Sequence, residues 1–416
     1  MNKLWSKLFV FAVAFLLLLF FSNDFGIVDI QKTAIVTAVG IDTSQGEGKF
    51  DVTAQIAMPA SAAQSGGGAD TSSNVSIQGA ETVGEAIAEI NRKTGWYPTL
   101  VHCRLVILGE DTAEDNVFRG LDYFLRSEFV EDSCLVAVCT GRAEQLLGAR
   151  SSIGDMTSRA IAKVLSNESQ KTGTVCVTNL RDFAKGYFSV SESGALPLLT
   201  AKPEAESGNS GQNGQSAAAP GPCVPVQSSP SGSGGSGQKS ANGKSDVFDA
   251  TETVLFYQGK RAAVLDEEET LAYNLADSPT DFAYGDVTVA ENGKNVTYNL
   301  KMKIDKKSQS IEVVNGVPVF TFRIRANAQI ADANKSDGII DIAKTTIVPA
   351  HVLRAAEQKF RDKLSSVLQK AGESGCDLFE MKIKLYRYAH KNYDALKDTI
   401  LQAVKPVYDI QFDTLK

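Results

Sequence analysis

The sequence predicts an α+β protein, with mixed α/β N-terminal domains followed by a C-terminal antiparallel sheet packed by long helices. Three observations support this fold class. Residues 33–140 alternate between strand and helix patterns, which indicates a layered sheet covered by helices. Residues 295–305 and 320–325 alternate apolar with polar side chains, as in strands with one buried and one solvated face. Residues 348–371 form a long amphipathic helix that would cover the buried face.

The first residues have the pattern of an export or membrane-anchoring segment. Lys3 and Lys7 precede residues 8–21, which contain no polar side chain, and Asp24 and Asp29 follow. This pattern predicts that the cationic end stays in the cytoplasm and that the rest of the chain lies outside. Small residues in an A-x-A-like arrangement do not follow the apolar run, which favours an uncleaved membrane anchor over a cleaved signal peptide.

Composition restricts the kind of partner that the chain can bind and predicts whether its cysteines form disulfides. The chain has 416 residues, of which 22% are charged and 43% hydrophobic, so we expect two or three ordinary globular domains. A net charge of −7 argues against nucleic acid as a partner, because phosphate binding requires a basic surface. The cysteines are widely spread, which predicts buried free thiols rather than a disulfide framework. They stand at positions 103, 134, 139, 176, 223 and 376.

The N-terminal half has the pattern of a series of strands and helices. β-Branched residues predict a buried strand at 33–41, which pairs with a second strand at 50–58. Thr82 and Glu85 form a capping-box pattern that begins a helix, and Gly95 ends it. The other predicted elements are a mobile loop at 59–73, strands at 100–108 and 135–140, helices at 112–126, 152–165 and 179–186 (the last capped by Thr178), and an extended segment at 195–201.

Residues 202–246 mark the clearest boundary in the chain. Small and polar residues dominate this segment, so it cannot bury enough apolar surface to offset its ordering entropy. It is therefore predicted to be a flexible linker. The chain then divides into a membrane anchor or signal segment at 1–25, an N-terminal α/β region at 26–201, the linker at 202–246 and a C-terminal α+β domain at 247–416.

The C-terminal part predicts a sheet and its helical cover. Segments 254–257 and 261–265 flank a short turn and form a hairpin. Pro349 would begin the long helix, and Gly372 would end it. The remaining predicted elements are helices at 267–274, 377–388 and 394–403 and strands at 287–290 and 408–412.

Sequence motifs for catalysis or cofactor binding are not found. None of the three histidines, at positions 102, 351 and 390, has the spacing of a zinc site. The G-x-S-x-G elbow, the P-loop and G-x-G-x-x-G do not occur in the sequence. We therefore expect no catalytic, cofactor-binding, metal-binding or lipidated residue, and no enzymatic activity.

Two other clusters of residues have a structural and a functional interpretation. Residues 267–269 are three consecutive glutamates, which favours the solvated first turn of a helix over an acid/base pair. Trp96 and Tyr97 follow the helix-ending Gly95. Packing of these aromatic rings back over the core is favoured over an exposed anchor for a partner protein.

Several segments also occur in an order that is typical of a known family. They are residues 29–30 with 33–42 (TAIVTAVGID), 50–59 (FDVTAQIAMP), 82–90 with Gly95, 102–110 (HCRLVILGE), 121–126 (LDYFLR), 195–199, the two alternating strands, the helix at 348–371, Asp377 and 386–388 (YRY). In this order they resemble the Ger(x)C family of spore germination proteins, the C-subunits of nutrient germinant receptors. The resemblance covers nearly the whole chain.

The N-terminal segment departs from the family pattern. Family members usually carry a lipobox cysteine followed by Trp-Asp shortly before the first strand. When this chain is aligned on residues 34–36, Asp24 and Phe25 stand at the Cys-Trp positions, and the first cysteine is Cys103. Diacylglycerol attachment at that site is therefore excluded, which agrees with an uncleaved helical anchor.

The resemblance implies a non-enzymatic, membrane-tethered receptor subunit on the extracytoplasmic face of the spore inner membrane. It implies assembly with integral membrane germinant receptor subunits, with a small-molecule germinant bound by the complex rather than by this chain. The exposed surfaces of the N-terminal layers would mediate assembly. Two alternatives remain open: an anchored extracytoplasmic ligand-binding or envelope scaffold protein not tied to spores, and an exported hydrolase.

Overall fold

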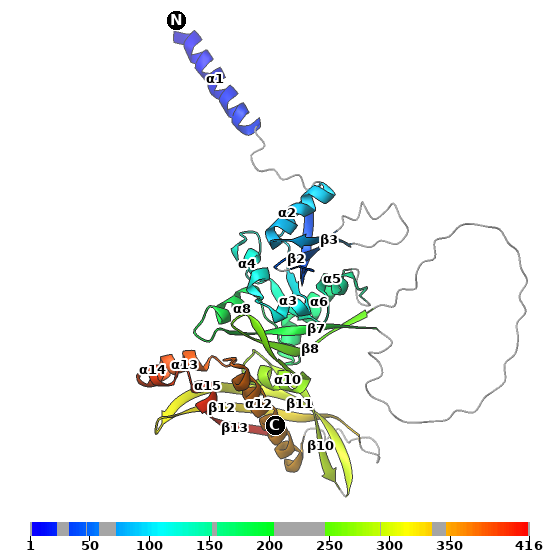
Figure 1. The fold of residues 1–416 in the computed structure, drawn as a ribbon, viewed down its shortest axis with the longest axis vertical. Helices are drawn as coiled ribbons and strands as arrows, with labels where there is room; N and C mark the ends of the chain where they lie inside the picture. Colours follow the sequence, from blue (N-terminus) through cyan, green and yellow to red (C-terminus); the bar gives the residue numbers. More distant parts are fainter. Residues whose placement is uncertain are drawn as a thin grey trace, which may run out of the picture.

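The computed structural model describes residues 2–22, 33–46, 48–57, 72–151, 156–203, 246–291, 293–334 and 347–414. Within these residues the chain builds two β-sheets with helices packed against them (Figure 1). The first sheet has nine strands and the second has four. The predicted α+β fold class is confirmed.

The first sheet has a parallel centre and antiparallel edges. Its strand order is β3-β2-β1-β5-β6-β7-β8-β9, with the short β4 beside β1. The pairs β1–β5, β5–β6 and β6–β7 are parallel, whereas β2–β3, β1–β2, β7–β8 and β8–β9 are antiparallel. The strands are β1 (Thr33–Thr43), β2 (Phe50–Ala57), β3 (Ser72–Ala80), β4 (Tyr97–Thr99), β5 (Leu105–Leu108), β6 (Leu135–Cys139), β7 (Ser193–Pro203), β8 (Asp246–Tyr257) and β9 (Lys260–Leu265).

Helices cover both faces of this sheet. Val106 and Leu108 of β5 belong to the core beneath α2, α4 and α8, whereas Leu105 and Ile107 belong to the core beneath α5 and α6. Because both faces are covered, the central strands are continuously apolar rather than alternating. The helices are α2 (Val83–Thr94), α3 (Glu110–Glu114), α4 (Phe118–Arg126), α5 (Ala143–Gly148), α6 (Thr157–Val164), α7 (Asn167–Lys171) and α8 (Leu180–Tyr187).

The predicted ends of α2 are confirmed, with one change in its cap. Thr82 Oγ1 accepts a hydrogen bond from the N–H of Glu85 at 3.1 Å, as a capping residue does. The Glu85 carboxylate accepts from the N–H of Glu81 at 3.0 Å rather than from Thr82. Gly95 ends the helix in the left-handed conformation, at φ 72°. The predicted apolar face is buried and consists of Val83, Ala86, Ile87 and Ile90.

Two predicted elements of the N-terminal half are shorter than expected. The strand predicted at 100–108 contracts to β5, because the Cys103 N–H bonds to the Leu100 carbonyl in a turn. The single helix predicted at 112–126 is two helices, α3 and α4, because the backbone at Asp115 is extended.

Other elements of this half were missed or misplaced by the sequence patterns. Ser72 and Ser73 begin strand β3 instead of ending a loop, and helices α5 and α7 were not predicted. The cap of α8 is Asn179, whose side chain accepts from the Asp182 N–H at 2.8 Å. Thr178 instead donates its hydroxyl to the Ala195 carbonyl at 2.9 Å.

The second sheet runs in the order β10-β11-β12-β13. Its first three strands are antiparallel, as predicted, but β13 is parallel to β12. Figure 1 shows α12 lying across one face of this sheet. The elements are β10 (Phe282–Glu291), β11 (Lys294–Val314), β12 (Val317–Ala333), β13 (Lys405–Thr414), α10 (Glu267–Ala276), α12 (Ala350–Ser374), α13 (Met381–Tyr388), α14 (Tyr393–Leu396) and α15 (Ile400–Ala403).

The long helix α12 ends later than predicted. Gly372 lies inside it, and Gly375 ends it in the left-handed conformation at φ 74°. A Cβ at Gly372 would lie 3.1 Å from the Leu401 carbonyl oxygen, so this glycine permits the close approach of α15. The helix predicted at 377–388 begins only at Met381, because Glu380 before it has a left-handed backbone at φ 51°. The Asp377 carboxylate accepts from the Met381 N–H at 2.6 Å. The helix predicted at 394–403 is split into α14 and α15.

The two sheets share packing contacts. The hairpin β8–β9, which follows the predicted linker, extends the first sheet rather than the second. Ala195 and Leu255 of the first sheet belong to the same core as the inner face of the second sheet. Ser191 Oγ donates to the Asp377 carboxylate at 2.6 Å, which joins the loop before β7 to the start of α13. The predicted division of the chain at 202–246 stays a prediction.

The N-terminal segment forms helix α1 (Asn2–Ser22). Within the residues that the structure describes, no helix combines the length and the apolar content needed to cross a membrane. The predicted loop at 59–71, the bulk of the predicted linker (204–245) and the lipobox-equivalent positions Asp24 and Phe25 lie outside the described residues.

Candidate interaction surface

A cluster of charged side chains lies where the parallel strands β1, β5 and β6 end. The buried Asp42 carboxylate, at the end of β1, accepts hydrogen bonds from the N–H groups of Ala143 at 2.7 Å and Glu144 at 3.0 Å. Asp42 thereby caps the N-terminus of α5 from a distant part of the chain. Burial raises the pKa of Asp42, and the two backbone hydrogen bonds only partly offset this effect.

Gly109 and Glu110 connect the end of β5 to this cluster. A Cβ at Gly109 would overlap Asp42 Oδ1, so the capping geometry requires glycine here. The Glu110 carboxylate accepts from the Gly141 N–H at 3.0 Å and pairs with Arg261 at 3.1 Å. The pKa of Glu110 is lowered, first by the Gly141 hydrogen bond and then by Arg261.

Arg142 completes the cluster on the other side. Its guanidinium lies 2.8 Å from Asp51, 3.3 Å from Glu144 and 3.9 Å from Asp42. Asp42, Glu110 and Arg142 therefore bond to groups of the same chain, which is the behaviour of a structural network. Sequence reasoning assigned no role to them, although Asp42, Gly109 and Glu110 stand in the motifs TAIVTAVGID and HCRLVILGE.

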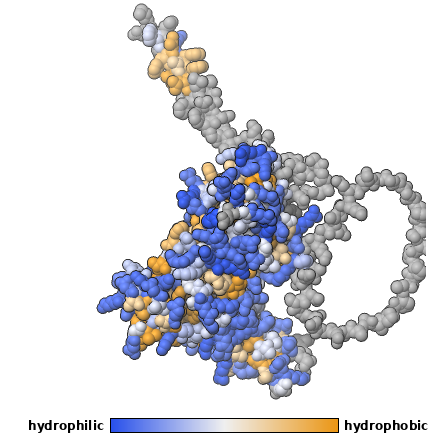
Figure 2. Space-filling view, in the orientation of Figure 1, coloured by the Kyte–Doolittle hydropathy of each residue, from blue (hydrophilic) through white to orange (hydrophobic). Residues whose placement is uncertain are grey.

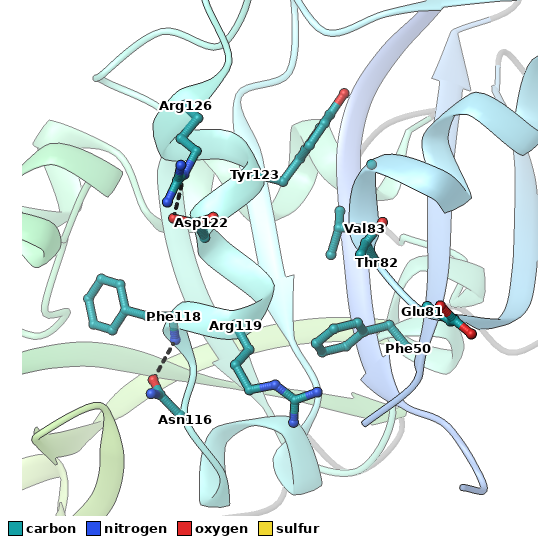
Figure 3. Close-up of a pocket in the computed structure, with 11 residues that line it drawn as sticks. Phe50, Glu81, Thr82, Val83, Asn116, Phe118, Arg119, Asp122, Tyr123 and Arg126 are labelled. Atoms are coloured by element: carbon teal, nitrogen blue, oxygen red, sulfur yellow. Dashed lines mark hydrogen bonds and ion pairs between the residues drawn. The ribbon is translucent and has the colours of Figure 1, made fainter. Parts of the chain in front are cut away.

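An open groove of about 600 Å³ lies beside this cluster, between the start of α2 and helix α4 (Figure 3). Figure 3 shows Thr82 and Val83 on one side and Tyr123 and Arg126 on the other. A Cβ at Gly84 would lie 3.1 Å from the Tyr123 ring, so the glycine allows α2 and α4 to pack closely. The groove is therefore lined by two closely packed helices.

The charged side chains of the groove differ in their exposure and in the contacts they already make within the chain. The Arg119 guanidinium lies 5.3 Å from the centre of the Phe50 ring, donates to the Gly48 carbonyl at 2.9 Å and pairs with Asp115 at 3.0 Å. Arg126 pairs with Asp122 at 2.8 Å, yet 79% of its side chain is exposed. Because arginine and tyrosine are the residues most enriched at binding hot spots, Arg126 and Tyr123 are the side chains best placed to meet a protein partner.

An aromatic cluster adjoins the groove at Phe118. The Phe118 ring stacks on Tyr187 at 3.7 Å and on Phe183 at 5.3 Å between ring centres. Phe188 lies 5.8 Å from Phe118, and 73% of it is exposed. Phe118 and Phe183 are buried, so Phe188 is the exposed edge of this aromatic cluster.

A second cavity, of about 420 Å³, lies between α10, α12 and β10. Leu271, Met302 and Phe360 are among its apolar lining residues. Lys359 and Lys363 also line it, and both pair with Glu268, at 2.6 and 2.8 Å. The cavity therefore offers apolar volume whose two lysines are already paired with Glu268.

The residues that the sequence singled out contact different parts of the molecule. His102 lies in a turn, His351 pairs with Glu291 at 2.9 Å, and His390 packs edge-on against Tyr386. The part of the chain that the structure describes contains no group of three or more side chains that could hold a metal ion. The expectations of no catalytic and no cofactor-binding residue stay predictions.

The interpretation of the three glutamates at 267–269 is corrected for one of them. Glu269 is buried, with 3% of its side chain exposed, and it pairs with Lys370 at 2.6 Å and accepts from Ser366 Oγ at 2.6 Å. It also completes a capping box with Asp266. Glu269 is thus an anchor for α12 rather than a solvated side chain.

The described cysteines follow the structural interpretation, and the aromatic pair follows it only at Trp96. Trp96 packs against the core, as expected, whereas Tyr97 is 61% exposed. The predicted buried free thiols are confirmed for Cys103, Cys134, Cys139, Cys176 and Cys376. Cys223 lies outside the described residues.

Comparisons with known proteins cover most of the chain. A family model described as "Spore germination protein N-terminal domain" matches residues 26–201. A second, described as "Spore germination B3/GerAC like, C-terminal", matches residues 251–411. The crystal structure of the GerBC protein matches with a TM-score of 0.44 and 14% identity, over 93% of this chain and 100% of that one. No curated protein matches the sequence. On the two family models, the chain belongs to the GerAC-like, or Ger(x)C, family of spore germination proteins.

Proposed function

We propose that this chain is a non-enzymatic, membrane-tethered subunit of a spore germinant receptor that acts by assembling with integral membrane subunits. Family membership over residues 26–201 and 251–411 is the observation that carries the proposal. The charged cluster around Asp42 and Arg142 caps α5 and joins neighbouring strands, which is a structural role. A small-molecule germinant would be bound by the assembled complex rather than by this chain.

Helix α1 is proposed to be the tether to the extracytoplasmic face of the membrane. Its exposed apolar side chains support this role, and Figure 2 shows them as an orange stretch apart from the mainly blue body. Each such side chain gains roughly 1.5–3 kcal/mol when it leaves water. They include Trp5, Leu8, Phe9, Val10, Phe11, Val13, Phe15 and Leu16.

Replacing Leu8, Phe11 and Phe15 by aspartate is expected to release the chain from the spore membrane fraction. A charged residue within a buried apolar helix costs about 2.5–3.5 kcal/mol, so three of them outweigh the remaining apolar contacts. The measurement is the amount of chain left in the membrane pellet after a high-salt wash. A control with Leu8→Val, Phe11→Leu and Phe15→Leu keeps the helix apolar and should stay in the pellet.

Mass analysis of the extracted native chain completes this test. An intact N-terminus is expected. Release of the native chain by salt alone, or a polypeptide that starts beyond Gly26, would contradict the tether.

The groove between α2 and α4 is proposed to be the assembly surface. Two side chains of the groove support this role, because 79% of Arg126 and 55% of Asp122 are exposed. The Tyr123 ring also lines the groove, and Phe188 is exposed nearby. Interfaces of this composition bind through a few arginine and aromatic anchors.

Exchanging the charges of one ion pair tests the groove without removing the pair. The double variant Asp122→Arg with Arg126→Glu is expected to reduce co-purified membrane subunits about tenfold or more, because it inverts the charge offered to the partner. The same exchange at Glu89 and Arg92, a 3.5 Å pair on α2 outside the groove, is the matched control. If both variants co-purify the same amount of membrane subunits and their thermal unfolding is unchanged, the groove is not the assembly surface.

A further inference from the structure

Two cysteines lie on neighbouring segments just before strands β5 and β6. Cys103 Sγ lies 3.7 Å from the carbonyl oxygen of Leu105, and Cys134 Sγ lies 3.8 Å from that of Leu135. Leu105 and Leu135 are register partners in the parallel pair β5–β6. The Leu135 N–H donates to the Arg104 carbonyl at 2.9 Å, so the two cysteines flank a backbone hydrogen bond. Two segments far apart in the sequence therefore place these two cysteines on adjacent strands.

Both thiols lie on the same face of the sheet. Strict strand alternation would place Cys103 on the face of Leu105, opposite to Cys134. The turn before β5 rotates Cys103 instead, and both cysteines belong to the core that contains Val106 and Val136. The side chains are close enough to hydrogen bond, and this contact, followed by burial, raises the pKa of Cys134.

The two buried cysteines lie against a surface groove. Cys103 and Cys134 are 2% and 1% exposed, but both line an open groove of about 590 Å³ together with Glu131 and Ser133. A small molecule that enters the groove reaches the sulfurs when the side chains that cover them move. Neighbouring thiols with an approach path have the arrangement that thiol–disulfide exchange requires.

We propose that Cys103 and Cys134 are a disulfide-forming pair, oxidised by exchange with a small or protein disulfide. The Cys103 thiolate attacks the oxidant R–S–S–R, forms a mixed disulfide and expels R–S⁻, which takes up the proton. Cys134 then loses its proton and attacks the Cys103 sulfur, which expels the second R–S⁻ as R–SH. Two thiols of the chain are oxidised, and one disulfide is reduced to two thiols.

The bond would close a loop that contains α3 and α4. A closed loop of roughly 30 residues restricts the unfolded chain and lowers the unfolding equilibrium constant by on the order of 100-fold. Because α4 forms one wall of the groove, the bond would also hold that wall against the sheet. The proposal does not depend on the tether or on the assembly surface.

Oxidation of the purified full chain tests the proposal directly. Cys223→Ser serves as the background, so that the five described cysteines are the only thiols. The protein is incubated with oxidised glutathione, alkylated, digested without reductant and analysed by mass. The expected product is a peptide pair joined through Cys103 and Cys134, two hydrogens lighter than its reduced parts, which dithiothreitol separates. The denaturant midpoint of the unreduced chain should rise on oxidation and return on reduction.

Single substitutions supply the controls. Cys103→Ala or Cys134→Ala should abolish both the joined peptide and the gain in stability. Cys139→Ala should leave both intact, because Cys139 belongs to the core on the opposite face and its sulfur contacts the Gly141 carbonyl at 3.8 Å. Alkylation of both thiols after oxidation would overturn the proposal, as would stable glutathione adducts on both or bonds that join either cysteine to another position or chain.

Discussion

Replacing Gly109 with alanine is expected to destabilise the protein by about 2–4 kcal/mol, the sum of overpacking and the loss of a helix cap. The new methyl group would overlap Asp42 Oδ1. Asp42 must then move away from Ala143 and Glu144, whose N–H groups donate hydrogen bonds to its carboxylate at 2.7 and 3.0 Å. The measurement is the free energy of unfolding in denaturant, together with hydrogen exchange in α5, which should increase.

A double-mutant cycle separates this mechanism from a general packing defect. Asp42→Ala removes the cap without a clash and should cost a similar amount. The pair Gly109→Ala with Asp42→Ala should cost little more than either single change, because the two residues act through one contact. Additive costs would show that Gly109 matters for another reason.

Gly148 supplies the matched glycine control. It lies in α5, and a Cβ there would meet nothing within 4 Å. Gly148→Ala should therefore be neutral or slightly stabilising, since alanine favours a helix over glycine. A loss of stability equal to that of Gly109→Ala would contradict the steric argument.

Replacing Glu269 with alanine is expected to cost about 2–3 kcal/mol. The change leaves Lys370 and Ser366 without their carboxylate and breaks the capping box with Asp266. The cost stays below that of a fully buried ion pair, because 37% of the Lys370 side chain is exposed. Glu267→Ala, an exposed change in the same helical turn, is the control and should cost little.

The same carboxylate predicts a change in the dependence of stability on pH. Burial alone would raise the pKa of Glu269, but the hydrogen bonds from Lys370, Ser366 and Asp266 outweigh it, and the net pKa is lowered from 4.5. A lowered pKa in the folded state adds stability above the unfolded value, and this stability is lost as the pH falls through the folded value. Glu269→Gln should therefore cost most above about pH 5 and flatten the fall in stability towards acid.

Denaturant unfolding of Glu269→Gln and the native chain at a series of pH values from neutral to acid measures this difference. Glu267→Gln, in the same turn, should keep the native pH profile. If the free energies of unfolding of Glu269→Gln and the native chain differ by the same amount at every pH, the lowered pKa of Glu269 is contradicted.

Much of the fold could be predicted because its signals are local. The capping pattern of Thr82 and Glu85, the apolar face of α2 and the alternation along β11 and β12 each lie within a short window of sequence. Strand β3 could not be predicted in this way, because its sequence SSNVSIQGA is mostly polar or small, and it is a strand only through pairing with β2. The break between α3 and α4 and the late end of α12 likewise depend on neighbouring elements.

The candidate surfaces depend even more on distant contacts. Asp42 meets Ala143 across a sequence separation of 101, and Cys103 meets Cys134 only because β5 and β6 are parallel partners. Glu269 is buried because α12 covers it, although the sequence around it is that of a solvated helix start.

By itself, the sequence determined the fold class, most of the helices and strands and the family to which the chain belongs, because periodicity, capping and ordered motifs are properties of neighbouring residues. Only the tertiary structure decided which sheet receives β8 and β9, which carboxylates are buried and which cysteines lie on adjacent strands. Those outcomes depend on packing between segments that are far apart in the chain, and a local pattern holds no information about such distances.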